Sequence, residues 1–184
     1  ASELQVVLTD KLIEESIYKL PPEVSSNYSA EIISTLKSRK ARLVEWAEEY
    51  YNALAKEVSI PGSEKSEIFM VQMVSADEIL VQVYDLDKEG KAKPGPFYSR
   101  RFSGKETDEI RIFGLSGNDI YKIDSRSDNP IKVRIVGGPM KDTYNFIGQK
   151  GKVHVYDNAD NEFPEQKIKK LSADSSIHTY LYDA

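Results

Sequence analysis

The first third of the chain carries apolar residues at the spacing of α-helices. In the first segment these residues share one helical face: Leu12, Ile13, Ile17 and Leu20. Thr9 or Asp10 offers a side chain that can cap the start of the helix, and Pro21–Pro22 stops it. We therefore predict a short amphipathic helix that begins near Thr9 and ends near Leu20.

A second and longer helical stripe follows. Ser29 has the side chain of an N-cap, and Glu31 follows early, where the helix dipole favours a negative charge. Apolar residues then recur at intervals of three, four or seven as far as about Glu57: Ile32, Leu36, Leu43, Ala47, Tyr50 and Leu54. This helix is either continuous or broken near Arg39–Arg42. We interpret the basic run Lys37–Arg42 as a solvated face and not as a binding patch.

From Glu67 onwards the apolar period changes to two, which is the period of β-strands. The predicted strands are Glu67–Val74, Glu78–Tyr84, Phe97–Phe102 and, in the tail, Ser176–Tyr182. Ser75-Ala76-Asp77 separates the first two strands and suits the turn of a hairpin. The polar stretch Asp85–Pro96 is expected to form an exposed loop.

Three strand-and-turn segments align without gaps and form an internal repeat: residues 109–121, 132–144 and 152–163. The equivalent positions Ile112, Ile135 and Val155 are 23 and then 20 residues apart. Each strand alternates apolar and polar residues and runs into a turn rich in glycine, asparagine or aspartate. Periods of this length are typical of stacked coils, in which like strands lie side by side and like turns form a column.

The fold class that these patterns predict is α+β. N-terminal helices, one of them long and amphipathic, would pack on a mostly β part with a hairpin and a three-rung stack, arranged as a β-solenoid or a sandwich. Pro61–Gly62 is the candidate boundary between a helical subdomain, residues 1–62, and a β-rich subdomain, residues 63–184. Because no long flexible linker accompanies it, we expect the two parts to pack as one unit.

Composition removes several classes of function. A net charge of −5 argues against nucleic acid as a partner, and no apolar run exceeds four residues, against the roughly 20 that a membrane-spanning helix needs. The chain has no cysteine and two histidines, His154 and His178, which are too few for a two-metal phosphatase site. We therefore expect no required cofactor, no transmembrane segment and no catalytic residues, and an enzyme in its own right is the least favoured hypothesis.

The turns of the repeat are close to the calcium-binding nonapeptide of β-rolls. The candidate ligands are Asn118, Asp119, Asp142, Asp157 and Asp160. Glycines in such turns let backbone carbonyls converge, and stacked carboxylates supply the hard oxygen ligands that calcium prefers. The alternative is that glycine, asparagine and aspartate are what tight turns require. A calcium-binding repeat domain is thus the second hypothesis for function.

Five motifs follow one another between residues 12 and 146: Ile13–Val24, Glu31–Lys37, Glu48–Val58, Glu109–Leu115 and Ile131–Tyr144. Together they resemble a segment of large cell-envelope proteins of Bacteroidetes-type bacteria. Those proteins are similar to calcineurin-like metallophosphoesterases, with an N-terminal phosphoesterase domain and, further on, an outer-membrane surface-antigen β-barrel. The aspartate, histidine and asparagine motifs that carry the family's phosphoesterase chemistry are absent here, so the chain resembles the region after the catalytic domain.

The resemblance implies a role and a place for this chain. It implies an accessory, linker or docking module whose partners are the neighbouring domains of a longer chain, the phosphoesterase domain and the outer-membrane barrel. It also implies a location in the periplasm or at the outer membrane. The opening residues Ala1-Ser2-Glu3 fit this expectation of a piece from a longer protein.

Overall fold

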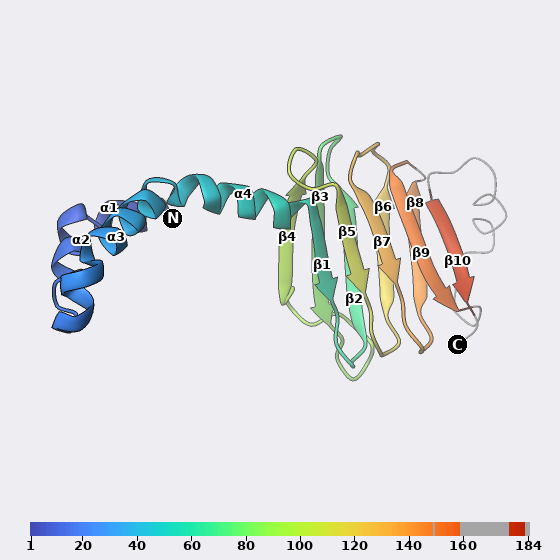
Figure 1. The fold of residues 1–184 in the computed structure, drawn as a ribbon. Coiled ribbons are helices and arrows are strands. Elements are labelled where there is room, and N and C mark those ends of the chain that lie inside the picture. The colour runs from blue at the N-terminus through green and yellow to red at the C-terminus, as the bar shows by residue number, and fades with distance from the viewer. Residues whose placement is uncertain (149, 159–176, 183–184) are drawn as a thin grey trace. The chain divides into compact units, whose positions relative to one another are not determined.

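The computed structural model describes residues 1–148, 150–158 and 177–182 and divides the chain into two compact units (Figure 1). Residues 1–54 form the helical unit and residues 55–184 the solenoid unit, and each is described by itself. The fold is α+β, as predicted, with four helices followed by strands in two sheets. None of the helices in the described part of the chain is long and apolar enough to cross a membrane.

The division between the units falls at Leu54–Ala55 and not at the predicted Pro61–Gly62. The reason is that Glu57–Pro61, which the sequence suggested as the end of a helix, forms a strand paired with Glu109–Phe113. The expectation that the two parts pack as one unit stays a prediction.

The helical unit contains α1 Ser2–Val7, α2 Asp10–Ile17, α3 Pro22–Ala41 and most of α4 Leu43–Lys56, whose last two residues belong to the solenoid unit. Thr9 caps α2 as predicted, since its side chain accepts the N–H of Leu12 at 3.1 Å. The predicted start of the next helix at Ser29 is wrong. α3 begins at Pro22, because the fixed φ of proline suits the first turn and its missing N–H is not needed there.

The long helical stripe is broken at Arg42, between α3 and α4. Part of the basic run before the break contacts another helix: Lys40 pairs with Asp10 of α2 at 2.7 Å, and Lys37 pairs with Glu14. The interpretation of this run as a purely solvated face is therefore wrong for two of its lysines, which join α3 to α2.

The solenoid unit consists of two five-stranded sheets. In order across it, the first sheet contains β1 Glu57–Pro61, β5 Glu109–Phe113, β7 Lys132–Val136, β9 Lys152–Asn158 and β10 Ile177–Tyr182, all parallel. The second sheet contains, also in order, β4 Tyr98–Ser103, β3 Glu78–Asp85, β2 Glu67–Met73, β6 Ile120–Ser125 and β8 Thr143–Gly148. Here β2, β6 and β8 are parallel, whereas β3 and β4 are antiparallel additions.

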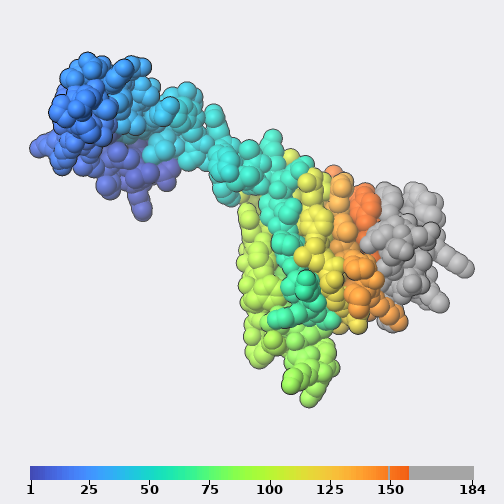
Figure 2. All heavy atoms as spheres, turned by 60° about the horizontal axis from the view of Figure 1, so that its bottom comes forward, coloured from blue at the N-terminus to red at the C-terminus, as the bar shows by residue number. Residues whose placement is uncertain are grey.

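In each coil the chain passes from the first sheet to the second, from β1 to β2, from β5 to β6 and from β7 to β8. It then returns to the first sheet, from β4 to β5, from β6 to β7 and from β8 to β9. Ile112, Ile135 and Val155 lie in register, as the repeat predicts. β3, which forms the predicted hairpin with β2, and β4 are inserted between the first two coils. In Figure 2 teal, yellow and orange atoms follow one another across the solenoid unit, in the order of β1, β5, β7 and β9, and the lime-green atoms of the inserted segment lie outside this order.

One hydrophobic core combines side chains from both sheets. Its largest fully buried members include three aromatic rings of the second sheet, Phe69, Tyr121 and Tyr144. These rings stack with centroid distances of 5.0 and 4.8 Å and interplanar angles of 12° and 7°. Because the separation equals the spacing of neighbouring strands, each coil contributes one ring to a continuous aromatic column.

Candidate functional site

Buried acidic side chains lie at the turns that lead into the second sheet. We call Glu67, Asp119 and Asp142 the acid column, because they occupy equivalent positions immediately before or at the start of β2, β6 and β8. Each is about 1 % exposed. Asp157, also buried, comes from the end of β9 and accepts a hydrogen bond from the hydroxyl of Tyr144. The structure therefore brings together three of the five predicted calcium ligands, Asp119, Asp142 and Asp157.

The acid column ties neighbouring coils together through backbone hydrogen bonds. Asp119 Oδ1 accepts the N–H of Glu67 at 2.8 Å, and Asp142 Oδ1 accepts the N–H of Asp119 at 2.8 Å. Glu67 in turn accepts the N–H and the hydroxyl of Ser63 at 3.0 and 2.7 Å. A buried backbone N–H without a hydrogen-bond acceptor destabilises the folded state. These carboxyl groups accept hydrogen bonds from N–H groups at the turns that are not paired within the sheets.

Burial also changes the protonation of these acids. It raises the pKa of Asp119 to about 8, and the neighbouring charges of Asp142 and Glu67 add to the effect. It raises the pKa of Asp142 to about 7, with a further contribution from Asp157 beside it. In the folded protein at neutral pH, Asp119 is therefore mostly protonated and Asp142 partly protonated.

The glycines of these turns are required mainly for space. A Cβ atom on Gly114 would meet the hydroxyl of Tyr121 and the carboxyl group of Asp119. A Cβ atom on Gly137 would meet the carboxyl groups of Asp142 and Asp157 and the hydroxyl of Tyr144. The acid column and its tyrosines can pack this close to the backbone only because these two positions lack a side chain.

The remaining calcium candidates are placed differently. Asn118 is exposed, and its Oδ1 accepts the N–H of Lys141 at 3.2 Å, whereas Asp160 lies outside the described residues. Within the described ranges, no group of three or more histidine, aspartate or glutamate side chains is arranged to hold a metal ion. Metal binding also requires deprotonated ligands, in competition with the protons described above. Calcium binding stays a prediction.

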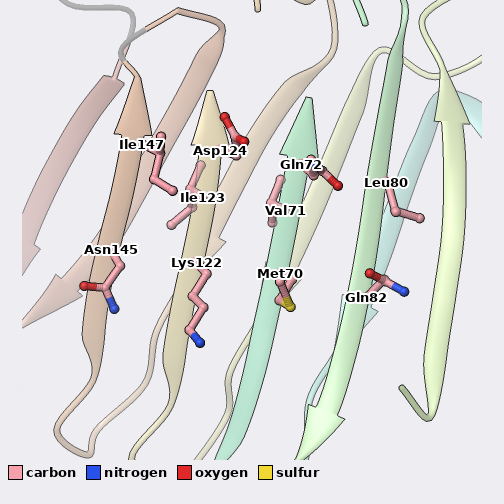
Figure 3. A pocket seen from close by; sticks show the side chains of 10 residues that line it. All are labelled: Met70, Val71, Gln72, Leu80, Gln82, Lys122, Ile123, Asp124, Asn145 and Ile147. Atoms are coloured by element: carbon pink, nitrogen blue, oxygen red, sulfur yellow. The ribbon is translucent and has the colours of Figure 1, made fainter. Parts of the chain in front are cut away.

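A second feature lies on the outer face of the second sheet. Two rows of side chains cross strands β3, β2, β6 and β8 and enclose a groove of about 260 Å³ (Figure 3). The first row is Gln82, Met70, Lys122 and Asn145, and the second is Leu80, Gln72, Asp124 and Ile147. Because the members of each row are register partners on neighbouring strands, the groove runs across the strands and not along them. We call it the sheet groove.

The walls of the sheet groove combine apolar and amide side chains. On β3, β2 and β8 each strand places one apolar residue opposite one amide, in the pairs Leu80 and Gln82, Met70 and Gln72, and Ile147 and Asn145. Met70 is 37 % exposed and Ile147 is 57 % exposed. None of the ten residues that line the groove is aromatic. The groove thus offers apolar contact together with hydrogen-bond donors and acceptors.

The central strand β6 supplies the charges of the groove. Asp124 is held by Arg126, at 2.8 Å to Nε and 2.6 Å to Nη2, and this guanidinium keeps the pKa of Asp124 below its usual value. Lys122 is exposed and makes no ion pair with any of the described residues. One ammonium group without an ion-pair partner among the described residues therefore lies in the middle of a mostly apolar and amide lining.

In comparisons with known proteins, no protein family, no curated protein and no solved structure matches the chain. A proposal for its function therefore depends on the geometry described above. Sequence reasoning did not find the sheet groove, because it did not identify β6 and β8 as strands. The available signal was the alternation of Tyr121 and Ile123 with Lys122 and Asp124 directly after a turn.

Proposed function

We propose that this chain is a non-catalytic docking module of a larger cell-envelope protein, and that the sheet groove is its docking surface. The observation that carries the proposal is the exposed groove itself, where Leu80, Met70 and Ile147 interrupt a polar sheet face across four strands. A contiguous, partly apolar surface with polar groups around it is typical of a site that another molecule covers.

The roles of the acidic residues support a non-catalytic module. In the described part of the chain, Asp119 and Asp142 of the acid column accept hydrogen bonds from backbone N–H groups of neighbouring coils, which is a structural role. The sheet groove contains Lys122 and Asp124 but no serine, cysteine or histidine that could act as a nucleophile with a neighbouring base.

The partners that we propose are neighbouring domains of a longer chain. The resemblance to the region after the catalytic domain of calcineurin-like metallophosphoesterases of the cell envelope supports this choice. Under this proposal the module acts in the periplasm or at the outer membrane. There the phosphoesterase domain would cover the sheet groove, and this contact would hold the domain in position.

Lysine footprinting tests the docking role. The isolated chain and the longer natural chain are each treated with a limiting amount of an acetylating reagent, and acetylation of Lys122 is measured by mass spectrometry. Lys152, exposed on the first sheet, is the internal reference. We expect the reactivity of Lys122 relative to Lys152 to fall in the longer chain and to recover in a Leu80→Lys/Ile147→Lys variant. An unchanged ratio would refute docking at this groove.

An activity assay tests the non-catalytic part of the proposal. The isolated chain is incubated with a chromogenic phosphomonoester and a phosphodiester, each with manganese, zinc or calcium. We expect no turnover above the buffer. Turnover that copurifies with the chain and disappears on substitution of one of its acidic residues would show that the chain is an enzyme.

A further inference from the structure

We infer that the sheet groove binds an extended peptide segment in which one acidic residue is flanked by apolar residues. The inference rests on the docking function proposed above and specifies the chemistry of the occupant. It is carried by the shape of the groove, by the alternation of its walls and by the position of Lys122.

The dimensions of the groove suit an extended chain. It crosses four strands, so its length is about 14 Å at roughly 4.8 Å per strand spacing. The two rows come from residues two positions apart along each strand, which separates the walls by about 7 Å. An extended peptide covers roughly 3.4 Å per residue, so about four residues span the groove.

The walls match a peptide in chemistry as well as in size. The amide groups of Gln72, Gln82 and Asn145 each carry donors and acceptors, which can pair with both the N–H and the C=O of a peptide backbone. Gln82 is partly oriented already, since its Nε2 donates to Ser99 at 3.4 Å. The apolar side chains Leu80, Met70 and Ile147 stand across from these amides, so they can contact side chains on either side of the bound backbone.

Charge selects the residue at the centre of the peptide. Lys122 lies between Met70 and Asn145 in its row, and the one acid of the groove, Asp124, is already bound by Arg126. A carboxylate from the occupant can therefore neutralise Lys122 without displacing an existing pair. A basic residue at the same place would be repelled by Lys122, so an acidic residue is preferred.

Two other occupants fit the groove less well. A second copy of this chain would cover the sheet face, which is about 24 by 17 Å and so about 400 Å² per partner at ordinary strand spacings. That total of about 800 Å² is below the 1,200–2,000 Å² of a stable dimer. A glycan is disfavoured because no aromatic ring lines the groove.

The test uses three end-capped fluorescent peptides, Leu-Val-Glu-Ile-Leu and its analogues with glutamine or lysine at the centre. Binding to the isolated chain is measured by fluorescence anisotropy. We expect the glutamate peptide to bind about threefold to fivefold more tightly than the glutamine peptide, and the lysine peptide to bind most weakly. Lys122→Gln should remove this preference, and Lys122→Glu should reverse it in favour of the lysine peptide.

Lys152→Gln is the matched control, because Lys152 is an exposed lysine on a parallel strand of the other sheet. It should leave the preference unchanged. Equal binding of all three peptides, no binding of any of them, or a preference that survives Lys122→Gln would overturn the inference. So would a concentration-dependent dimer in sedimentation that Leu80→Lys abolishes, or binding of neutral oligosaccharides that excludes the glutamate peptide.

The two proposals can fail separately. If Lys122 is shielded in the longer chain but the peptides bind equally, docking stands and the acidic peptide is wrong. If the glutamate peptide is preferred but Lys122 is equally reactive in both chains, the specificity stands and docking within the longer chain is wrong.

Discussion

The helical unit and the solenoid unit bury their apolar side chains to different extents. Among the described residues, two buried apolar side chains, Ile13 and Ile33, belong to the helical unit, and twenty belong to the solenoid unit. A fully buried apolar side chain contributes about 1.5–3 kcal/mol, whereas a solvent-screened ion pair at the surface such as Lys40–Asp10 contributes far less. The free energy of unfolding is therefore concentrated in the solenoid unit.

The same difference appears in the carboxyl groups. In the helical unit, hydrogen bonds from Lys40 and Arg42 lower the pKa values of Asp10 and Glu45. In the solenoid unit, burial raises the pKa of Asp119. Partners at the surface thus control Asp10 and Glu45 of the helical unit, and burial controls Asp119 and Asp142 of the acid column. Four experiments, taken from the largest expected effect to the smallest, test this contrast.

Removing one ring from the aromatic column should have the largest effect. Tyr121 is completely buried between Phe69 and Tyr144, so Tyr121→Ala should lower the free energy of unfolding by about 3–5 kcal/mol. The matched change in the helical unit, Tyr50→Ala, removes a ring that is 68 % exposed and should cost less than about 0.5 kcal/mol. Urea denaturation followed by circular dichroism measures both. Equal losses would contradict the contrast in burial.

Raising the pH should weaken the solenoid unit. The pKa values of Asp119 and Asp142 in the folded state, about 8 and about 7, lie above the unfolded value of 3.8, so unfolding releases protons. The free energy of unfolding should therefore fall as the pH rises from about 4 through 8, by up to about 1.4 kcal/mol per pH unit for each proton that unfolding releases. Urea titrations near pH 5, 7 and 9 measure the slope.

Two variants check the source of this pH dependence. Asp119→Asn/Asp142→Asn keeps oxygen atoms for the backbone N–H groups but cannot titrate, so its stability should vary less over the same range. Asp10, whose pKa is lowered, contributes stability that is present at neutral pH and lost as the pH falls below about 4. Asp10→Asn should therefore lower the stability at neutral pH and change its pH dependence only at the acid end. Stability that rises between pH 5 and 9 in the natural chain would refute the protonated column.

Adding one methyl group at a crowded turn should have a smaller effect. Gly137→Ala places a Cβ atom against the carboxyl groups of Asp142 and Asp157, and overpacking of this kind costs roughly 1–3 kcal/mol. Gly90→Ala meets no atom within 4 Å and strains only a positive φ of 75°, which costs about 1 kcal/mol. Comparison of the two urea midpoints measures the crowding. If Gly137→Ala lowers the urea midpoint no more than Gly90→Ala does, the acid column does not depend on the absence of a side chain at position 137.

Calcium should have the smallest effect. The carboxyl oxygens of Asp119 and Asp142 accept backbone N–H groups, so we expect the same thermal midpoint in chelator and in millimolar calcium. A ligand that binds only the folded state, at 100 times its Kd, would add about 2.7 kcal/mol. A rise in the midpoint that Asp119→Ala abolishes would make the column a calcium site and would reverse our account of these acids.

Local patterns in the sequence predicted the strands whose alternation is strict. Glu109–Phe113 and Lys132–Val136 alternate apolar and polar residues and repeat one another, so their parallel pairing was predictable. The hairpin was predictable because its strands are adjacent in the chain. Glu57–Pro61 was not, since five residues that follow the end of a predicted helix carry no local sign of a partner more than 50 residues away.

The candidate site was only half predictable. The turn repeat brought Asp119 and Asp142 together correctly, but their burial and their bonds to backbone N–H groups depend on the neighbouring coils. The sheet groove could not be predicted without the register of four strands. Leu80 and Ile147 lie in the same groove only when β3, β2, β6 and β8 are paired in the observed register.

The aromatic column also separates the two units optically. The chain has one tryptophan, Trp46, which lies in α4 with the guanidinium of Arg42 at 4.8 Å from its ring, so indole fluorescence reports on the helical unit. Parallel rings 5.0 and 4.8 Å apart couple their electronic transitions, and the stacked tyrosines of the solenoid unit should therefore dominate the near-ultraviolet circular dichroism. One denaturation experiment that records both signals can follow each unit without any added label.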